Sequence, residues 1–130
     1  MDFIDWLDVD YVSKSNDEIV ATMNVRAELL QPFGYLHGGV TIALLESVAS
    51  EGAWLNCGPR EIPFGVDVHV AHRSSVKEGV VKGTARLAKE ENTSKGYRKQ
   101  TWDVSALRPD GTIVSEGSII CLIVPNPGVE

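Results

Sequence analysis

The chain has 130 residues, 43% of them hydrophobic and 23% charged, which fits one folded domain over residues 1–130 and excludes a disordered chain. Its formal net charge of −6 excludes a general nucleic-acid binder, because such proteins carry a basic face. It has neither a run of about 18 uncharged apolar residues nor a signal-peptide pattern at its start, so we expect a cytoplasmic protein with no membrane partner.

The N-terminal third predicts a short helix and then a strand. Residues 2–8 form an amphipathic pattern with Phe3, Trp6 and Leu7 on one side. Residues 18–30 alternate well enough to predict a strand. The turn-forming residues 31–34 end this pattern, and His37-Gly38-Gly39 follows.

Residues 40–55 predict the central helix. The segment is long, apolar and free of proline, and at this length a helix is favoured over a strand. Its apolar residues cover most of the helix circumference, whereas a surface helix would show one stripe. We therefore predict a helix enclosed on nearly all sides. Asn56, Gly58 and Pro59 end it.

The rest of the chain predicts four long strands, at 64–70, 81–87, 102–106 and 113–124, with turns near 78–79, 91–95 and 109–111. The order is therefore a strand, one buried helix and four strands. An antiparallel sheet curled round a single central helix is an α+β design. So small a domain gains stability from oligomerisation, which also supplies extra walls for a site.

Glu46 is the first candidate for chemistry. It stands within the apolar helix, and none of its neighbours three or four residues away is basic. Burying an unpaired carboxylate is costly, so such a group usually marks a functional cavity. The alternatives are a solvated stripe shared with Ser50 and Glu51, or an ion pair with a distant arginine.

His37-Gly38-Gly39 lies where this helix begins. Two glycines let a carbonyl compound approach the backbone, and the first N–H groups of a helix point outward at the positive end of its dipole. This arrangement can stabilise the oxyanion of a thioester. A plain glycine turn capped by His37 is the alternative.

Other polar residues give weaker signals. Phe64, Val66, Val68 and Val70 alternate with their neighbours, and His72 has the same parity, so it is predicted to face inward, whereas His69 is predicted to be structural. No histidine pair at metal spacing is present, no GxSxG elbow supports a serine nucleophile, and Cys57 and Cys121 are predicted not to be catalytic. Several basic residues could receive CoA phosphates: Arg73, Lys77, Lys95, Arg98 and Lys99.

The segment 31–50, from Gln31-Pro32-Phe33-Gly34 through His37-Gly38-Gly39 to Glu46-Ser47-Val48-Ala49-Ser50, resembles the hotdog-fold thioesterases. The resemblance recurs over 65–73 and covers nearly the whole chain in element order. The most similar branch holds the phenylacetate-pathway, Arthrobacter-type 4-hydroxybenzoyl-CoA and 1,4-dihydroxy-2-naphthoyl-CoA thioesterases. Many relatives have Asp where this chain has Glu46, and Glu is typical of the hydroxybenzoyl and naphthoyl enzymes.

This resemblance implies roles that spacing alone does not give. Glu46 corresponds to the family nucleophile or general base, and the Gly38 N–H to its oxyanion donor. Gln31 and His37 orient the thioester carbonyl, and Ser50 assists water or the leaving group across a dimer interface. The implied substrate contacts are His72, Gly65, Arg73, Ser74 and Arg98. The expected enzyme hydrolyses a small aromatic acyl-CoA, needs no cofactor or metal, and forms dimers that pair into tetramers.

Two other functions remain open at this stage. A non-catalytic acyl-CoA sensor on the same scaffold would bind the ester without releasing thiol. An enoyl-CoA hydratase would pair an Asp with a His about five residues later, where this chain has Glu46 and Glu51.

Overall fold

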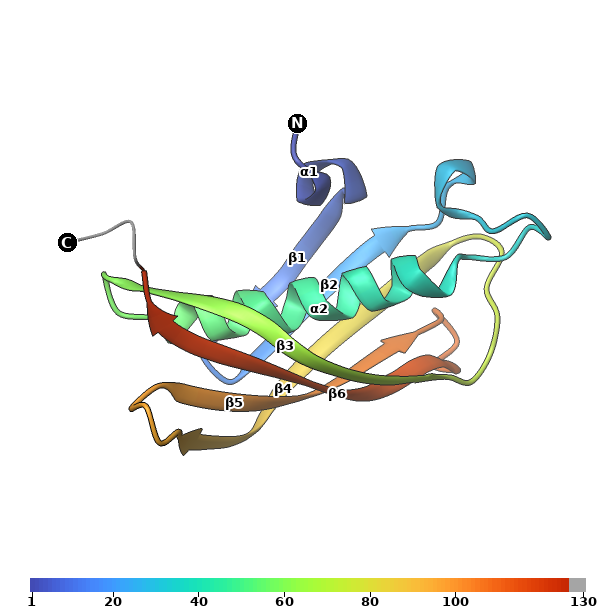
Figure 1. Cartoon of the computed structure of the whole chain (residues 1–130). Coiled ribbons are helices and arrows are strands. Elements are labelled where there is room, and N and C mark those ends of the chain that lie inside the picture. The colour runs from blue at the N-terminus through green and yellow to red at the C-terminus, as the bar shows by residue number, and fades with distance from the viewer. Residues whose placement is uncertain (127–130) are drawn as a thin grey trace.

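The computed structural model of the chain describes residues 1–126, which form one curled sheet and two helices. The elements in chain order are α1 (Phe3–Leu7), β1 (Val9–Lys14), β2 (Glu18–Asn24), the 3-10 turn η1 (Ala27–Leu29), α2 (Gly38–Leu55), β3 (Glu61–His72), β4 (Val80–Asn92), β5 (Arg98–Leu107) and β6 (Ile113–Pro125). The strands are antiparallel in the order β1-β2-β4-β5-β6-β3 (Figure 1). Within the described residues no helix is long and apolar enough to cross a membrane.

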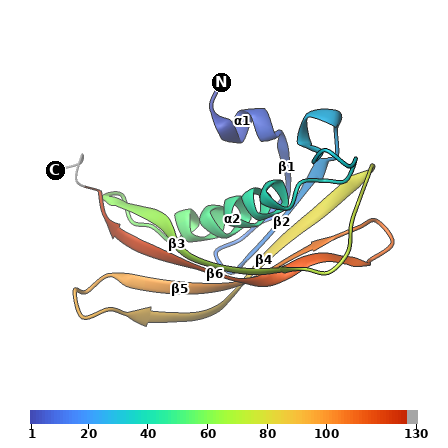
Figure 2. The same cartoon turned by 45° about the vertical axis from the view of Figure 1, so that its right-hand side comes forward.

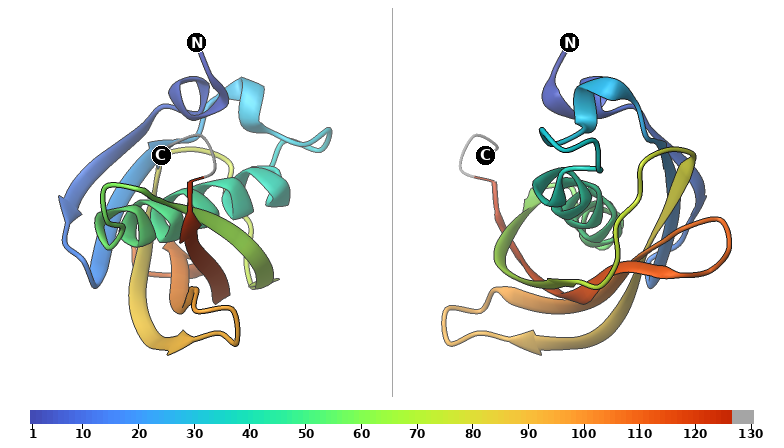
Figure 3. Two further views of the ribbon diagram at one scale, coloured as in Figure 1. Left: turned by 60° about the vertical axis from the view of Figure 1, so that its left-hand side comes forward. Right: turned by 90° about the vertical axis from the view of Figure 1, so that its right-hand side faces the viewer.

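The sheet curls round α2, which lies along its concave face (Figures 2 and 3). Leu44, Leu45 and Val48 of α2 are fully buried against inward side chains of the strands, each worth about 1.5–3 kcal/mol of stabilisation. Trp102 of β5 reaches the helix at Gly52, where a Cβ atom would lie 2.3 Å from the indole ring. The α+β hotdog architecture expected from the sequence is therefore confirmed.

The prediction that α2 is enclosed on nearly all sides is wrong for the single chain. Its buried face carries Leu44, Leu45 and Val48, but Ile42, Glu46 and the other residues of the opposite face are only half-buried or exposed. The reason lies in the topology. Because β1 and β3 form the two edges of the curled sheet, the curl stays open between them, and one face of α2 lies in that opening.

The strand predicted over 18–30 is also shorter than expected, and one strand was missed. β2 ends at Asn24, after which the chain turns into η1, because Leu29 packs into the core from a 3-10 turn. β1 escaped prediction because it is an edge strand with mostly exposed side chains, so its sequence lacks a buried alternating face. The sheet thus has six strands where the sequence predicted five.

A β-bulge changes the side-chain parity of β3. The register with β6 shifts between Gly65 and Asp67, so Gly65 faces Cys121 while Val68 and His72 pair with the buried residues Ile119 and Ser115. The His72 ring therefore lies on the α2 side of the sheet, over Gly38, although the residue is exposed at the open end of the curl. Phe64 and Val66 are each 53% exposed on this edge strand, which corrects the simple alternation read from the sequence.

Candidate functional site

Glu46 lines a cavity of about 500 Å³ at the opening between the two edges of the sheet. The walls are mainly apolar, and they come from α1, β1, α2 and the start of β3. The lining residues are Phe3, Ile4, Tyr11, Ala43, Glu46, Ser47, Ser50, Glu51, Trp54 and Pro63. Size and lining suit a small organic group rather than water alone.

The Glu46 side chain packs against β3 at Gly65. A Cβ atom at Gly65 would lie 2.5 Å from Glu46 Oε2, so only glycine leaves room for the carboxylate there. No ion pair joins Glu46 to a basic group within residues 1–126, in contrast to Glu51 and Glu61. The predicted distant arginine partner is therefore not found among these residues. The cavity predicted beside Glu46 is present.

Ser50 lies one helical turn after Glu46 on the same cavity wall, and the buried thiol of Cys121 lies beneath it. Burial raises the pKa of Cys121 to about 11, an effect opposed by a hydrogen bond with Ser50 and reinforced by the charge of Glu46. The thiol therefore stays protonated near neutral pH and is not a nucleophile. Both cysteines are free.

Glu51, which also lines the cavity from α2, forms a charged pair with Lys14 of β1. Lys14 Nζ lies 3.0 Å from Glu51 Oε1 and 4.7 Å from the centre of the Tyr11 ring. Burial, with the charge of Glu51 second, raises the pKa of Tyr11 to about 12, so its hydroxyl remains a donor. Neither Tyr11 nor Lys14 was predicted as a site residue, because β1 itself was not recognised.

A second group of polar atoms surrounds the N-terminus of α2. His37 caps the helix, its Nδ1 accepting the Gly39 N–H at 2.8 Å, so the proton of a neutral ring is on Nε2. The Gly38 N–H donates to no group within the described residues, at the positive end of an 18-residue helix. Gly38 is thus the free amide, as the resemblance implies.

Gln31, His72 and Ser74 lie around this amide, lining a hollow of about 220 Å³ with Gly38. The Gln31 Oε1 accepts backbone N–H groups of Phe33 and Tyr35, which leaves the Nε2 amide to donate. The His72 ring covers Gly38, where a Cβ atom would lie 2.7 Å from Nε2, and its Nδ1 is 2.6 Å from Ser115 Oγ. Glycine is needed at both Gly38 and Gly65 for packing reasons.

The two groups are separated along α2. Gly38 and Glu46 are eight residues apart, which corresponds to about 12 Å along the helix axis. One thioester carbonyl cannot contact both, since a reacting atom must lie roughly 3 Å from each. The structure thus brings Glu46, Ser50 and Gly65 together in one place and places the Gly38 group in another.

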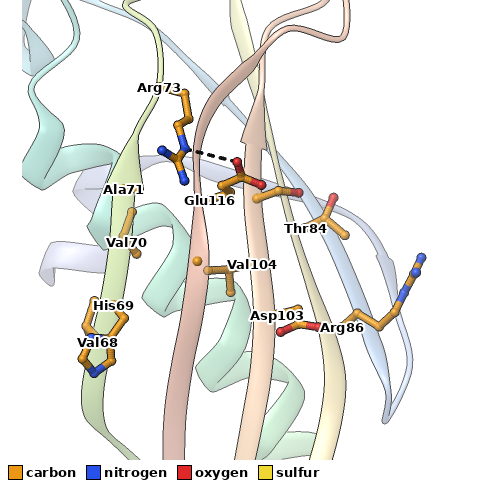
Figure 4. A pocket seen from close by; sticks show the side chains of 12 residues that line it. Val68, His69, Val70, Ala71, Arg73, Thr84, Arg86, Asp103, Val104 and Glu116 are labelled. Atoms are coloured by element: carbon orange, nitrogen blue, oxygen red, sulfur yellow. Dashed lines mark hydrogen bonds and ion pairs between the residues drawn. The ribbon is translucent and has the colours of Figure 1, made fainter.

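Arg73 lies on the outer face of the sheet. Its Nε is 3.2 Å from Glu116 Oε2, in an open hollow of about 1030 Å³ that also contains Arg86 and Asp103 (Figure 4). This hollow is shallow and carries both signs of charge, and it lies on the far side of the sheet from Glu46. It therefore belongs to neither of the two groups.

Arg98 lies at the C-terminal end of α2. Its Nη2 donates to the Asn56 carbonyl at 2.7 Å and to Glu61 Oε1 at 2.7 Å, and Nη1 lies 3.6 Å from Glu90. This guanidinium therefore caps the helix and joins it to β3 and β4. Within residues 1–126 no three His, Cys, Asp or Glu side chains are arranged to hold a metal ion.

Comparison with known proteins identifies a family. The model of the thioesterase superfamily matches residues 33–114. This stretch includes Gly38 and His72 of the N-terminal group and Glu46, Ser50 and Gly65 of the cavity. Gln31 and the cavity residues of α1 and β1 lie before it. A 1,4-dihydroxy-2-naphthoyl-CoA hydrolase from Listeria monocytogenes is 36% identical over 96 residues, 74% of each chain. A proofreading thioesterase from Cronobacter turicensis is 29% identical over 101 residues, 78% of this chain and 70% of its own.

Solved structures agree with this result. A thioesterase from Staphylococcus aureus superimposes with a TM-score of 0.87 at 25% identity, covering 94% of this chain and 98% of its own. A thioesterase from Haemophilus influenzae gives a TM-score of 0.83 at 26% identity, over 95% and 83% of the two chains.

Proposed function

The chain belongs to the thioesterase superfamily and is a hotdog-fold thioester hydrolase, and we propose that it hydrolyses the CoA ester of a small hydroxylated aromatic acid with Glu46 as its catalytic carboxylate. The observation that carries this proposal is the unpaired Glu46 in an apolar cavity. No cofactor is required, because a carboxylate, an amide donor and water suffice for this hydrolysis.

Glu46 has two possible roles, and the cavity is compatible with both. As a nucleophile it attacks the thioester carbon, expelling CoA thiolate and forming a mixed anhydride that water then hydrolyses. As a general base it takes a proton from a water that attacks instead. Ser50, one turn further along the same wall, is placed to hydrogen-bond the water in either route.

The oxyanion is proposed to bind at the N-terminus of α2. The Gly38 N–H has no other partner among the described residues, and the Gln31 Nε2 group can donate beside it. One such donor is worth about 10²–10³ in rate. His37 is proposed to orient the carbonyl through Nε2, since its Nδ1 is occupied by Gly39.

A homodimer would unite the two groups, which lie too far apart in one chain. Its proposed interface is the free edge of β3, where Phe64 and Val66 are each 53% exposed. A twofold axis there would make the contact reciprocal, so the partner's Glu46 would approach Gly38 of this chain and the reverse would hold at a second site. Pairing of such dimers into tetramers is part of the proposal.

The proposed acyl site is the cavity between Glu46 and the Lys14–Glu51 pair. Its apolar walls, Phe3, Ile4 and Trp54, suit a ring. A hydroxyl on that ring can donate to Glu51, which lines the cavity and pairs with Lys14, whereas a carboxylate would be repelled by Glu51. The name of the Listeria relative, a dihydroxynaphthoyl-CoA hydrolase, supports this substrate class.

CoA itself is proposed to lie along the β3–β6 end near Gly38. Ser74 lines the hollow with Gly38 and His72, and Arg73 precedes it in the chain. The Arg73 guanidinium is 59% exposed and could turn from Glu116 to a phosphate. Arg98 already contacts three protein groups, so it is left out of this proposal.

The proposal is tested by thiol release from a panel of CoA esters: hydroxybenzoyl, dihydroxybenzoyl, phenylacetyl, naphthoyl and straight-chain. We expect turnover of the hydroxylated aromatic esters and a loss of about 10³-fold or more in kcat for Glu46→Gln. Glu51→Gln is the matched control on the same helix, since it should weaken selection among rings but keep turnover. Near-normal kcat in Glu46→Gln would contradict the role of Glu46, and loss of enoyl absorbance without thiol release would favour a hydratase.

A further inference from the structure

The N-terminal helix forms one wall of the acyl cavity but has little to hold it in place. Phe3 and Ile4 of α1 line the cavity, opposite Trp54 of α2. The helix has five residues, of which only Leu7 is buried. Isolated helices shorter than about 12–15 residues are marginal in water, so α1 depends on contacts from elsewhere.

Arg26, which follows β2, supplies these contacts. Its guanidinium donates to the last two carbonyls of α1, to Leu7 O at 3.3 Å and to Trp6 O in a very short hydrogen bond. The same group stacks 4.7 Å from the centre of the Trp6 ring. These carbonyls have no partner inside the helix, so a fork of donors satisfies both at once.

Arg26 is oriented by its own partner and lies outside the cavity. Glu28 Oε2 accepts from Arg26 Nε at 3.1 Å, and the Arg26 side chain is 28% exposed. Arg26 is not among the residues that line the cavity. Its direct route to the cavity is through its contacts with Trp6 and Leu7 of α1.

We propose that Arg26 is a positioning residue that fixes the α1 wall of the acyl cavity and so sets the enzyme's preference for a ring-sized acyl group. This inference rests on the proposed function, because it takes the cavity beside Glu46 to be the acyl site. With α1 held, Phe3 and Ile4 close the cavity round a ring. Without Arg26 the wall is mobile, and ring binding must also order α1.

The decisive experiment is a double-mutant cycle on the full chain, with hydroxybenzoyl-CoA as substrate. Arg26→Ala should raise KM about tenfold and leave kcat within about twofold. The double substitution Phe3→Ala and Ile4→Ala, which removes the α1 side chains that line the cavity, should likewise raise KM about tenfold and leave kcat within about twofold. Adding Arg26→Ala to the truncated wall should change nothing further, because residues that act through one element are not additive. Additive effects, or a fall in kcat alone, would overturn the proposal.

Controls separate positioning from general stability. Glu28→Gln removes the ion pair but keeps both bonds to α1, so its KM should be that of the wild type. Arg26→Lys, which keeps the charge but loses the fork, should give an intermediate KM and serves if Arg26→Ala does not fold. Acetyl-CoA, too short to reach α1, should be hydrolysed equally by the wild type and Arg26→Ala. An equal loss for both esters would contradict the idea.

Two readouts do not need turnover. Amide exchange at Trp6 and Asp8, whose N–H groups bond within α1 and its caps, should quicken in Arg26→Ala while the strands stay protected. The dissociation constant of the stable thioether S-(4-hydroxyphenacyl)-CoA should rise about tenfold. If the wild type does not bind this thioether, the proposed function fails. If the wild type and Arg26→Ala bind it equally, only the role of Arg26 fails.

Discussion

The two polar groups along α2 differ in how their side chains are held. At the N-terminus, His37, Gln31 and His72 each have a hydrogen-bond partner, and the Gly38 N–H has none within the described residues. In the middle of the helix, Glu46 lines a mainly apolar cavity and contacts β3 at Gly65. One group is polar and hydrogen-bonded, and the other holds a half-buried carboxylate in a mainly apolar cavity.

In the proposed mechanism, this difference corresponds to the two demands of thioester hydrolysis. An oxyanion is stabilised by donors already fixed in place, so rigidity is useful at Gly38. A nucleophile or base gains reactivity when few donors compete for it, so sparse surroundings are useful at Glu46. The roughly 12 Å between them along the helix means that neither group is a complete site in one chain.

Mixing inactive chains gives the strongest test of this division. The Glu46→Ala chain lacks the carboxylate. The chain with Gln31→Ala and His37→Ala lacks two side chains beside the Gly38 amide. Each variant alone should lose about 10²-fold or more in kcat. In a mixed dimer one site receives both lesions and the other receives neither. With random pairing, about a quarter of wild-type activity should return.

Thiol release from hydroxybenzoyl-CoA, measured after the two chains are unfolded and refolded together, checks this. Mixing without refolding is the control, since intact dimers should stay inactive. If refolding restores nothing, each chain must use its own groups, and the division between them has no functional meaning.

Gly65→Ala should sharpen the comparison from the Glu46 side. The new Cβ would lie 2.5 Å from Glu46 Oε2, so the carboxylate must move while the Gly38 group is untouched. We expect kcat to fall about 10²-fold with little change in KM, because misplacing a reacting group has that effect. Steady-state kinetics beside a thermal melt distinguish this from unfolding. Unchanged kcat would mean that Glu46 does not need its contact with β3.

Whether the sequence predicts an element correctly depends on whether its side chains face the core, solvent or a cavity. Trp102 and Val104 alternate because one face of β5 is buried, so that strand was predicted correctly. β1 faces solvent on most of its length and gave no such signal. The apolar circumference of α2 predicted a helix enclosed on nearly all sides, and this was wrong. The sequence alone cannot distinguish a helix face covered by the sheet from one that borders a cavity.

The candidate site divides in the same way. Glu46, Gly38 and Gln31 could be named as candidates because a charge in an apolar helix, a glycine pair and a spaced motif are visible in the sequence. Tyr11 and Lys14 were missed, because their approach to Glu51 depends on how the curled sheet closes. Arg98 was predicted as a phosphate ligand from its charge alone, and its three protein partners could only be seen in the fold.

The smallest expected effect concerns the thiol beneath the Glu46 group. Because burial raises the pKa of Cys121 to about 11, the folded chain keeps this proton at pH values where the unfolded chain, with a thiol pKa near 8.5, has lost it. Stability should therefore be fully present below about pH 8.5 and fall as the pH rises towards 11. Two units correspond to roughly 2–3 kcal/mol, an upper value for this group.

Urea unfolding between pH 8 and 11 measures this loss, and Cys121→Ala should remove part of the slope. The part that remains should come from Tyr11, whose pKa is raised to about 12, and from Cys57, whose pKa is also raised by burial. A slope unaltered in Cys121→Ala would mean that the thiol titrates as if exposed. The wall under Ser50 would then be open to water, and the contrast between the mainly apolar Glu46 cavity and the hydrogen-bonded Gly38 group would be weaker than the structure indicates.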